Sequence, residues 1–333
     1  MPYSVSPSLP RQLYHLLRDR QGDYLELDQL GQALGQPTGA IQQGVLSLQA
    51  ERLAIEYHPT LGCRLLRLPE ALVAHELTYH LATRYLGQQV WVHQEVDSTN
   101  DEARLLADQG TPEGALVVAE SQRAGRGRRG RSWYSPAGVG LWYSLLFHPP
   151  GQLTSGVLPL LLGVAIAFTL RRGCNVQACL KWPNDILIAH RKVAGVLCER
   201  YAPAGQDPVL IAGTGINVHQ ETFPVSLQSS ATSIYQETRE KPNRCLLLKQ
   251  LLQETENLYL EAVESGTSRI LDQAKELSAT LGQDILWKVG LHQVRGRACD
   301  LLPDGALLVE TESGCRQTIS AGDICHLGPG PAG

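Results

Sequence analysis

Arg126, Arg128, Arg129 and Arg131 stand close together in residues 125–131, where glycines separate them. A guanidinium group is permanently charged, and its planar donors suit phosphate or carboxylate oxygens. Glycine permits the backbone to fold around such an anion. Four like charges repel one another until an anion lies among them. We therefore expect this segment, called the arginine loop below, to become ordered only when its ligand binds.

The arginine loop also matches the dinucleotide-binding pattern G-x-G-x-x-G. A Rossmann fingerprint opens a helix and is followed about 20 residues later by an acidic residue that holds the ribose. Here Trp133 and Ser135-Pro136 follow, then an alternating strand, and no carboxylate occurs in residues 121–184. These features argue against a Rossmann site. The flanking apolar strands also argue against a disordered nucleic-acid tether rich in arginine and glycine.

Three other segments carry polar groups that suit binding or catalysis. In the segment Lys-Trp-Pro-Asn-Asp at 181–185, the last two residues could orient an amine or bind a metal, and Lys192 could neutralise a phosphate or carboxylate oxygen. Ser-Thr-Asn at 98–100 stands where a strand should give way to a helix, so these residues are helix caps or a polar clamp for a neutral ligand. Gly-Thr-Gly-Ile-Asn at 213–217 is a strand end without side-chain bulk at two positions.

These segments need a scaffold, and the region from about residue 90 to residue 280 alternates between strands and helices. Segments of period 2 predict strands at 90–96, 115–120, 140–147 and 209–216. Segments of helical period predict helices at 100–109, 158–171 and 244–265, preceded by a helical stretch at 69–86. We expect an α+β catalytic domain built on a mixed sheet and spanning residues 69–281.

Residues 1–68 predict a winged helix-turn-helix domain. Leucines recur at helical spacing in residues 9–17 and 27–34, and Thr38 is placed to cap a third helix. Residues 53–68 alternate around a turn, as expected of a two-stranded wing.

That shape suggests DNA binding, but residues 1–70 hold six arginines, no lysine and seven carboxylates, a small supply of cations for phosphate contacts. The third helix has no charged residue. Its polar side chains could still contact bases or phosphates; they are Thr38, Gln42, Gln43, Ser47 and Gln49. DNA binding and a protein-contacting role both stay open.

The last fifty residues predict a small β-barrel. Short strands at 284–289, 293–301, 306–310 and 316–319 are separated by glycine-containing turns.

Composition limits the class of protein. The chain has 333 residues, 29 Lys and Arg against 33 Asp and Glu, and a hydrophobic fraction of 43%, which fits two or three globular domains. Its first residues lack the layout of a signal peptide, and its eight cysteines form no C-x-x-C pair. We expect a cytoplasmic protein. The longest apolar run, 157–170, is broken and too short to cross a membrane, so we interpret it as a buried helix.

Together these motifs resemble those of the biotin protein ligases of the BirA type. The similarity runs in order through nearly the whole chain, and the arginine loop and the Lys-Trp-Pro-Asn-Asp segment are specific to that family. The lysine and glycine pattern of the related lipoate ligases is absent. The resemblance implies a winged helix at 1–68, a class II synthetase-like catalytic domain at 69–281 and an SH3-like barrel at 282–333.

The resemblance also implies a two-step reaction. The biotin carboxylate attacks the α-phosphate of Mg-ATP, which gives biotinyl-5′-adenylate and pyrophosphate. A lysine of a biotin carboxyl carrier protein, from acetyl-CoA carboxylase or a related carboxylase, then attacks the adenylate and releases AMP. A homodimer linked to ligand binding and a biotin-responsive repressor activity are further implications. The alternative is a protein that acts mainly as a biotin-sensing DNA-binding regulator.

Residue roles follow from the same resemblance. Catalysis is assigned to Arg128 and Lys192, and no metal ligand is assigned. We add the hypothesis that Asp185 is also catalytic and accepts a hydrogen bond from the carrier lysine in the second step. The residues matched to biotin are Ser98, Thr99, Asn100, Gln122, Arg126, Gly127, Arg128 and Lys192. Those matched to the nucleotide are Arg126, Arg128, Lys181, Asn184 and Asn217. Some relatives stack a tryptophan on adenine, but residues 184–285 contain none, so another apolar contact must serve there.

Overall fold

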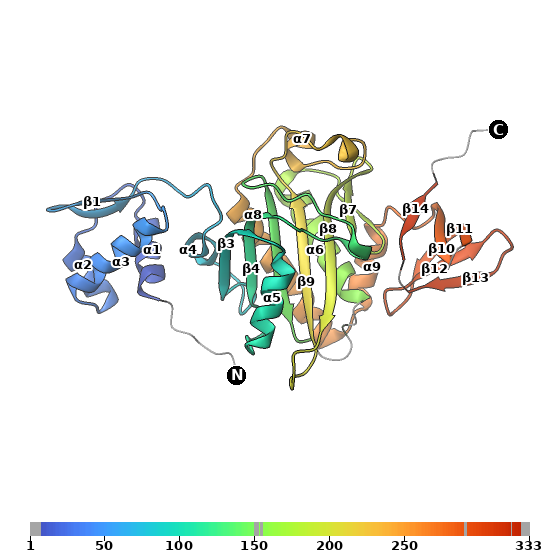
Figure 1. The fold of residues 1–333 in the computed structure, drawn as a ribbon, viewed down its shortest axis with the longest axis horizontal. Helices are drawn as coiled ribbons and strands as arrows, with labels where there is room; N and C mark the ends of the chain where they lie inside the picture. The colour runs from blue at the N-terminus through green and yellow to red at the C-terminus, as the bar shows by residue number, and fades with distance from the viewer. Residues whose placement is uncertain (1–7, 150–152, 154–155, 290–291, 321, 328–333) are drawn as a thin grey trace. The chain divides into compact units, whose positions relative to one another are not determined.

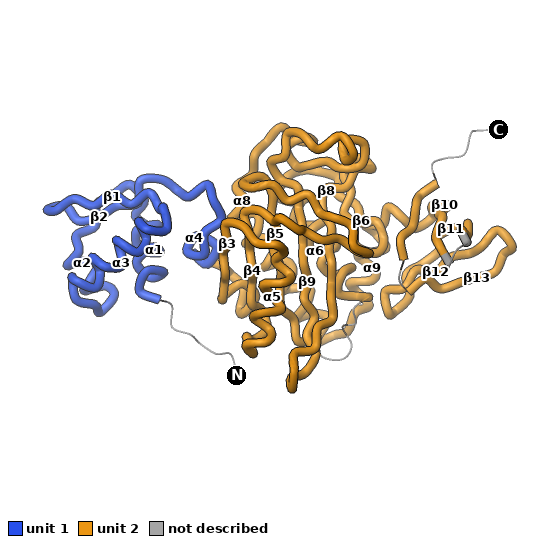
Figure 2. The backbone as a smooth tube through the Cα atoms, in the orientation of Figure 1, with its two compact units in different colours: residues 1–80 blue, residues 81–333 orange. Residues whose placement is uncertain are grey.

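The structure, a computed structural model, describes residues 8–149, 153, 156–289, 292–320 and 322–327. Contacts between residues divide the chain into two compact units, Met1–His80 and Leu81–Gly333 (Figure 2). Each unit is described by itself.

Unit 1 consists of three helices followed by a hairpin and a short fourth helix. Their bounds are α1 Leu9–Asp19, α2 Leu27–Leu34, α3 Thr38–Ala50, β1 Ile55–His58, β2 Gly62–Leu65 and α4 Ala74–Thr78. The strands β1 and β2 pair antiparallel. The three helices and the hairpin predicted from apolar spacing are confirmed.

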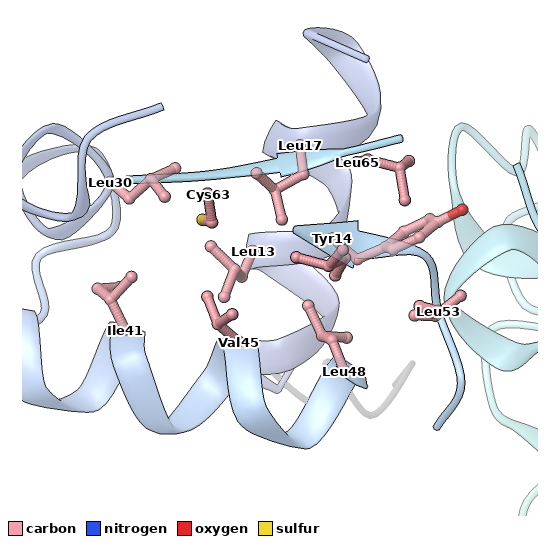
Figure 3. Packing of buried hydrophobic residues seen from close by; sticks show 11 residues of the cluster. Leu13, Tyr14, Leu17, Leu30, Ile41, Val45, Leu48, Leu53, Cys63 and Leu65 are labelled. Carbon is pink, nitrogen blue, oxygen red and sulfur yellow. The ribbon is translucent and has the colours of Figure 1, made fainter. Parts of the chain in front are cut away.

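One apolar cluster holds unit 1 together. Ile41, Val45 and Leu48 lie on one face of α3 and point toward Leu13 and its neighbours on α1 (Figure 3). Their spacing of three or four residues is the helical period that places side chains on one face. Each fully buried aliphatic side chain of this kind contributes about 2 kcal/mol to folding.

Two local predictions, the helical stretch at 69–86 and the cap at Thr38, are wrong. The helical stretch expected at 69–86 contains only the five-residue α4. The carboxylate of Glu256 accepts hydrogen bonds from the backbone N–H groups of residues 84–86, which therefore form a turn. Thr38 is not the cap of α3, because its hydroxyl donates to Asp28 at 2.7 Å. The amide of Gln49 faces the hairpin and donates to the carbonyl of Ile55 at 2.9 Å.

Unit 2 is built on a seven-stranded sheet in the order β3-β4-β5-β9-β8-β7-β6 (Figure 1). The strands are β3 Val90–Val96, β4 Leu116–Gln122, β5 Gly140–Phe147, β6 Cys179–Lys181, β7 Asp185–Ile188, β8 Arg191–Tyr201 and β9 Val209–Asn217. β3 and β4 run parallel and the other neighbours antiparallel. The sheet is mixed, as predicted, and the fold is α+β.

Helices cover both faces of this sheet. The helices of unit 2 are α5 Thr99–Asp108, α6 Val157–Cys174, α7 Ile234–Thr238, α8 Arg244–Ser265 and α9 Ser268–Glu276. On β5, Leu146 packs in a cluster with α5, whereas the next residue, Phe147, contacts Tyr259 of α8. Successive side chains of a strand point to opposite faces, so α5 and α8 lie on opposite sides of the sheet.

Helix α6 is the apolar run singled out in the sequence. Among the described residues it is the one helix long and apolar enough to cross a membrane, with a mean hydropathy of 1.6, and 78% of it is buried inside the protein. That burial is expected of a core helix, which is how the sequence was interpreted.

The chain ends in a five-stranded antiparallel sheet in the order β13-β12-β11-β10-β14. The strands are β10 Asp284–Val289, β11 His292–Leu301, β12 Leu307–Thr311, β13 Arg316–Ile319 and β14 Ile324–His326. The first four were predicted. β14 was not, because three residues are too few to show an alternating pattern.

Candidate active site

One cavity of about 680 Å³ lies in unit 2, at the N-terminal end of α5, a volume typical of small-molecule sites. All twelve residues singled out in the sequence line it: Ser98, Thr99, Asn100, Gln122, Arg126, Gly127, Arg128, Lys181, Asn184, Asp185, Lys192 and Asn217. They come from strands, helix starts and loops that are up to 119 positions apart along the chain. The fold therefore gathers segments that the sequence could show only one by one.

A wall of uncharged polar groups closes one side of the cavity. The hydroxyl of Ser144 donates to Asn100 Oδ1 at 2.6 Å and lies 2.8 Å from Thr99 Oγ1. The backbone N–H of Thr99 donates to Gln122 Oε1 at 3.0 Å. Ser98 occupies the cap position of α5 without a capping side-chain hydrogen bond. The side chains from α5 and β5 are buried and Gln122 is half-buried. The hydrogen bonds among Thr99, Asn100, Gln122 and Ser144 fix a set of donors and acceptors that suits a neutral ligand.

The two glycines of β9 in this region leave space for other side chains. A Cβ on Gly213 would lie 2.3 Å from Asn100 Oδ1, and one on Gly215 would lie 2.3 Å from Trp133 Nε1. The Gly-Thr-Gly pattern therefore reflects a close approach of two side chains to the strand rather than a flexible turn.

Trp133, which follows the arginine loop, packs over β9 and β8. Lys192 Nζ lies 5.0 Å from the centre of its ring, within the range of a cation–π contact. The indole N–H of Trp133 is buried and finds no hydrogen-bond partner among the described residues. A buried donor of this kind is costly unless a ligand or water accepts from it.

The arginine loop contains a turn at Arg128–Gly130, and its charges face a carboxylate from the C-terminal sheet. Asp323 Oδ1 lies 3.6 Å from Arg128 Nη1, and Asp323 Oδ2 lies 3.9 Å from Arg129 Nη1. Arg131 also forms an ion pair with Asp323. Burial is the main influence on Arg128 and lowers the pKa of its guanidinium. An anion from the chain itself thus lies among charges that we expected to repel one another.

A second cationic group stands on β8 beside β7. Lys192 Nζ lies 2.6 Å from Asp185 Oδ1. A shift of register between these strands lets the lysine reach back to the first residue of β7. Asn184 Oδ1 accepts from Arg128 Nη1 at 3.3 Å. Asp185 therefore forms an ion pair with Lys192, and Asn184 forms a hydrogen bond with the arginine loop.

The C-terminal sheet contributes to the cavity and is held against it by buried contacts. The indole N–H of Trp182 donates to the carbonyl of Gly305 at 2.9 Å. His326, which lines the cavity, lies with Nε2 3.1 Å from Thr280 Oγ1. Burial, followed by the positive charges of Lys181 and His190, lowers the pKa of His326 to about 4.

An apolar side of the cavity comes from the segment after β9, where Phe223, Leu227 and Ala231 line it. This segment pairs with β8, since the N–H of Lys192 donates to the carbonyl of Ser230 at 2.8 Å. Asn217 lies beside it and donates to the carbonyl of Thr232 at 2.9 Å.

Several cavity residues were missed by sequence reasoning. Ser144 does not line the cavity itself, but it orients Thr99 and Asn100 from within an apolar strand. Asp323 precedes β14 and His326 ends it, and Phe223 and Leu227 belong to a segment without a motif. No local pattern marked these four.

Among the described residues, no three His, Cys, Asp or Glu side chains gather to hold a metal ion. All eight cysteines are free.

Comparison with known proteins agrees with this geometry. Residues 92–217 match the biotin/lipoate A/B protein ligase family, and residues 280–327 match the biotin protein ligase C terminal domain. The chain is 32% identical over 318 residues to the bifunctional ligase/repressor BirA of Bacillus subtilis, covering 94% of this chain and 98% of that protein. It is 30% identical over 233 residues to a biotin–[acetyl-CoA-carboxylase] ligase of Paracoccus denitrificans, covering 68% and 96%. A solved biotin protein ligase from Aquifex aeolicus in complex with biotin and ATP is similar with a TM-score of 0.64 and 29% identity, over 72% of this chain and 99% of that one.

Proposed function

Because the chain belongs to the biotin protein ligase family, we propose that the cavity described above is where it joins biotin to ATP. The protein is an ATP-dependent ligase that forms biotinyl-5′-adenylate and transfers the biotinyl group to a carrier-protein lysine.

We propose that the ligands divide the cavity according to its chemistry. The neutral polar wall, with Ser98, Thr99, Asn100 and Gln122, takes the ureido ring of biotin, whose donors and acceptors need fixed partners. The apolar side, with Phe223 and Leu227, takes adenine in place of the missing tryptophan, and Asn217 lies beside it. The cationic groups lie in the same cavity as both sides, where the two substrates must meet.

The first step brings two anions together, a carboxylate and an α-phosphate, so positive charge near both lowers the barrier. Arg126, Arg128, Lys181 and Lys192 are the candidate groups, with Gly127 allowing the loop backbone to approach the ligand. We assign adenylate stabilisation to Arg128 and Lys192. Asn184, which accepts from Arg128, helps to hold that guanidinium in place.

The reaction also needs magnesium, and its adenylate intermediate must be protected from water. Magnesium usually binds to substrate phosphates, with few protein ligands, and no metal-holding cluster occurs among the described residues. We therefore propose that it arrives with ATP as part of the substrate. The mixed anhydride is prone to hydrolysis, so the arginine loop and Trp133 also serve to keep bulk water away from it.

The second step needs a neutral lysine from the carrier protein, whose pKa in water is about 10.4. We propose that Asp185 accepts a hydrogen bond from the incoming amine and eases its deprotonation. Its present partner is Lys192 at 2.6 Å, so the carboxylate is already held at the reacting end of the cavity. Asp185→Asn should then slow transfer from preformed adenylate more than it slows adenylate formation.

The convergence of Arg126, Arg128, Lys181 and Lys192 on one cavity with a neutral polar wall is the observation that carries this proposal. The test measures labelled biotin incorporated into an apo carrier domain and, separately, pyrophosphate released in the first step. Lys192→Gln should slow the first step about 100-fold, the usual loss when one stabilising donor is removed. Arg128→Gly should speed dissociation of the adenylate.

Lys275→Gln is the matched control. Lys275 also pairs with an aspartate, Asp300, at 2.8 Å and is 33% exposed against 32% for Lys192, but it lies outside the cavity. We expect wild-type rates from it. Failure of the wild-type protein to label the carrier would overturn the assigned activity. A wild-type first step in Lys192→Gln would overturn the role of that lysine.

A second candidate function is DNA binding by unit 1 as a biotin-responsive repressor. The relative from Bacillus subtilis is named a ligase/repressor, and its match covers 94% of this chain. Three helices and a hairpin support a winged-helix assignment for residues 1–68. The outward face of α3 offers Gln42, Gln43 and Ser47, but no charge. The test is a gel shift of operator DNA at rising salt concentration, and no shift at low salt would remove this candidate.

Three further assignments complete the proposal. We place the catalytic domain at residues 69–281 and an SH3-like barrel at 282–333. The carrier is the biotin carboxyl carrier protein of acetyl-CoA carboxylase or a related enzyme, and a dimer forms when adenylate is bound. The location is cytoplasmic, where free cysteines such as these eight stay reduced.

A further inference from the structure

A fork of two hydrogen bonds ties the arginine loop to helix α5. Asp101 Oδ2 accepts from Arg126 Nη1 at 2.7 Å, and Asp101 Oδ1 accepts from Arg126 Nη2 at 2.5 Å. A bidentate pair of this kind fixes direction as well as distance. Asp101 stands in the first turn of α5, where the helix dipole also favours a carboxylate.

Two more residues hold Asp101 in place. Arg104 Nη1 donates to Asp101 Oδ1, and Arg104 Nη2 donates to Glu199 Oε1, both at 2.7 Å. Glu199 Oε2 accepts from Asn100 Nδ2 at 2.6 Å. The series Arg126, Asp101, Arg104, Glu199 and Asn100 therefore runs without a break from the arginine loop to the buried polar wall.

The charges in this series balance, with two guanidinium groups against two carboxylates. The hydrogen bond from Arg126 is the main cause that lowers the pKa of Asp101, and the same bond raises the pKa of Arg126. Both groups therefore stay charged near neutral pH. Their side chains are about one third exposed, at 34% for Arg126 and 36% for Asp101, so water weakens each pair. The network therefore contributes mainly by fixing the orientation of the Arg126 guanidinium rather than by stabilising the fold.

The arginine loop thus has two anchors of different kinds. Asp323 contacts the three later arginines, the groups that a phosphate would approach. Asp101 instead holds Arg126, and it uses one edge of that guanidinium while the remaining N–H groups stay available to a ligand. Of these two anchors, and within the described residues, the Asp101 anchor is the one that hydrogen bonds join to the wall that we assign to biotin.

We propose that Asp101 is a positioning residue for the ligase reaction. It acts through Arg126, which keeps the first half of the arginine loop over the bound biotinyl group. Glu199 holds Arg104, and Arg104 in turn holds the carboxylate of Asp101 in position. This inference rests on the proposed function. It predicts that Asp101 governs how well biotin and the adenylate are retained more than how fast they react.

The test uses Asp101→Asn and Arg126→Gln in the full-length chain, alone and together. The measurements are KM for biotin, kcat of adenylate formation, the dissociation rate of the adenylate, and trypsin cleavage after the remaining loop arginines without ligand. Asp101→Asn should speed both adenylate dissociation and loop cleavage about fivefold, the size expected for residues coupled in one network. KM for biotin should rise more than kcat falls. The double variant should match Arg126→Gln alone.

Asp108→Asn is the control, because Asp108 is on the same helix and accepts from Tyr201 at 2.7 Å outside the cavity. It should behave as wild type. If Asp101→Asn does not fold, Arg104→Gln removes the support instead and should shift cleavage in the same direction. Wild-type cleavage and adenylate retention in Asp101→Asn, or in Arg104→Gln, would overturn the proposal, as would additive effects in the double variant. An inactive wild-type enzyme would overturn the proposed function. The trypsin cleavage rates would still show whether Asp101 holds the arginine loop in place.

Discussion

Adding one methyl group at Gly215 should impair the first step of the reaction while the fold stays intact. A Cβ there would lie 2.3 Å from Nε1 and 2.5 Å from Cε2 of Trp133, whereas non-bonded carbon atoms rest about 3.5 to 4.0 Å apart. β9 is paired on both sides, with β5 and β8, so the strand cannot yield. The indole must move by about 1 Å to restore ordinary contact.

That displacement has a structural cost and a catalytic one. Overpacking of this kind costs about 1 to 3 kcal/mol of stability, which a domain of this size tolerates. Trp133 also lies beside Lys192, and a misplacement of about 1 Å at a reacting site can lower the rate about 100-fold. We therefore expect Gly215→Ala to slow adenylate formation by one to two orders of magnitude, on the order of 10- to 100-fold.

Single-turnover formation of biotinyl-adenylate measures the effect, with thermal unfolding recorded in parallel. Gly173→Ala is the control, because its Cβ would meet only the end of the flexible Gln250 side chain, at 3.3 Å, outside the cavity. It should react at the wild-type rate. If a folded Gly215→Ala protein also reacts at the wild-type rate, Trp133 does not help to form the reacting site.

Three other outcomes follow from the contacts of unit 2 and from its separation from unit 1. Asp323→Asn should speed hydrogen exchange at the backbone amides of the arginine loop, because three ion pairs are lost; unchanged exchange would mean that Asp323 does not order the loop. Folding lowers the pKa of His326 from 6.5 to about 4, so the unfolded chain binds a proton at this residue more readily than the folded chain does. The free energy of unfolding should therefore be highest above pH 6.5 and should drop by up to about 3 kcal/mol as the pH falls from 6.5 to 4. His326→Gln should reduce that drop in denaturant melts; the same drop in the variant would assign it to other groups. Removing residues 1–80 should leave adenylate formation within about twofold of wild type, because every residue that lines the cavity belongs to unit 2; a large loss would show that unit 1 supports the cavity.

Most of the fold was predictable because its elements carry strong periodic patterns. Ile41, Val45 and Leu48 mark one face of α3 by spacing alone, and the four strands predicted for the central sheet were placed to within two residues. The other three strands of that sheet, β6, β7 and β8, were not predicted. The errors arose where a distant group decides the local structure. Glu256 lies on α8, yet it binds the backbone of residues 84–86 and ends the helix that the sequence favoured there.

The residues of the candidate site also fall into those that the sequence predicted and those that only the fold revealed. The arginine loop and Lys192 were found because several charged or polar residues stand together in the sequence. Asp323 stands alone among uncharged neighbours and is 192 positions from Arg131, so its meeting with the loop is a property of the folded chain. The Gly-Thr-Gly pattern of β9 was visible, but its meaning depends on Asn100 and Trp133, which no spacing rule brings to that strand.

The hydrogen bond between Trp182 and Gly305 limits how this enzyme can be recombined with its homologues. The indole is buried, and its acceptor is a turn whose Gly305 has a positive φ of 84° and lies against Gly156 at the start of α6. A transplanted C-terminal sheet whose turn presented a side chain there would leave the indole N–H without an acceptor, at a cost of about 1 to 3 kcal/mol. That loss would fall on a segment whose neighbouring Lys181 and Asp185 line the cavity. Compatibility between such chimaeric parts therefore depends on this turn as well as on the partners of His326 and Asp323.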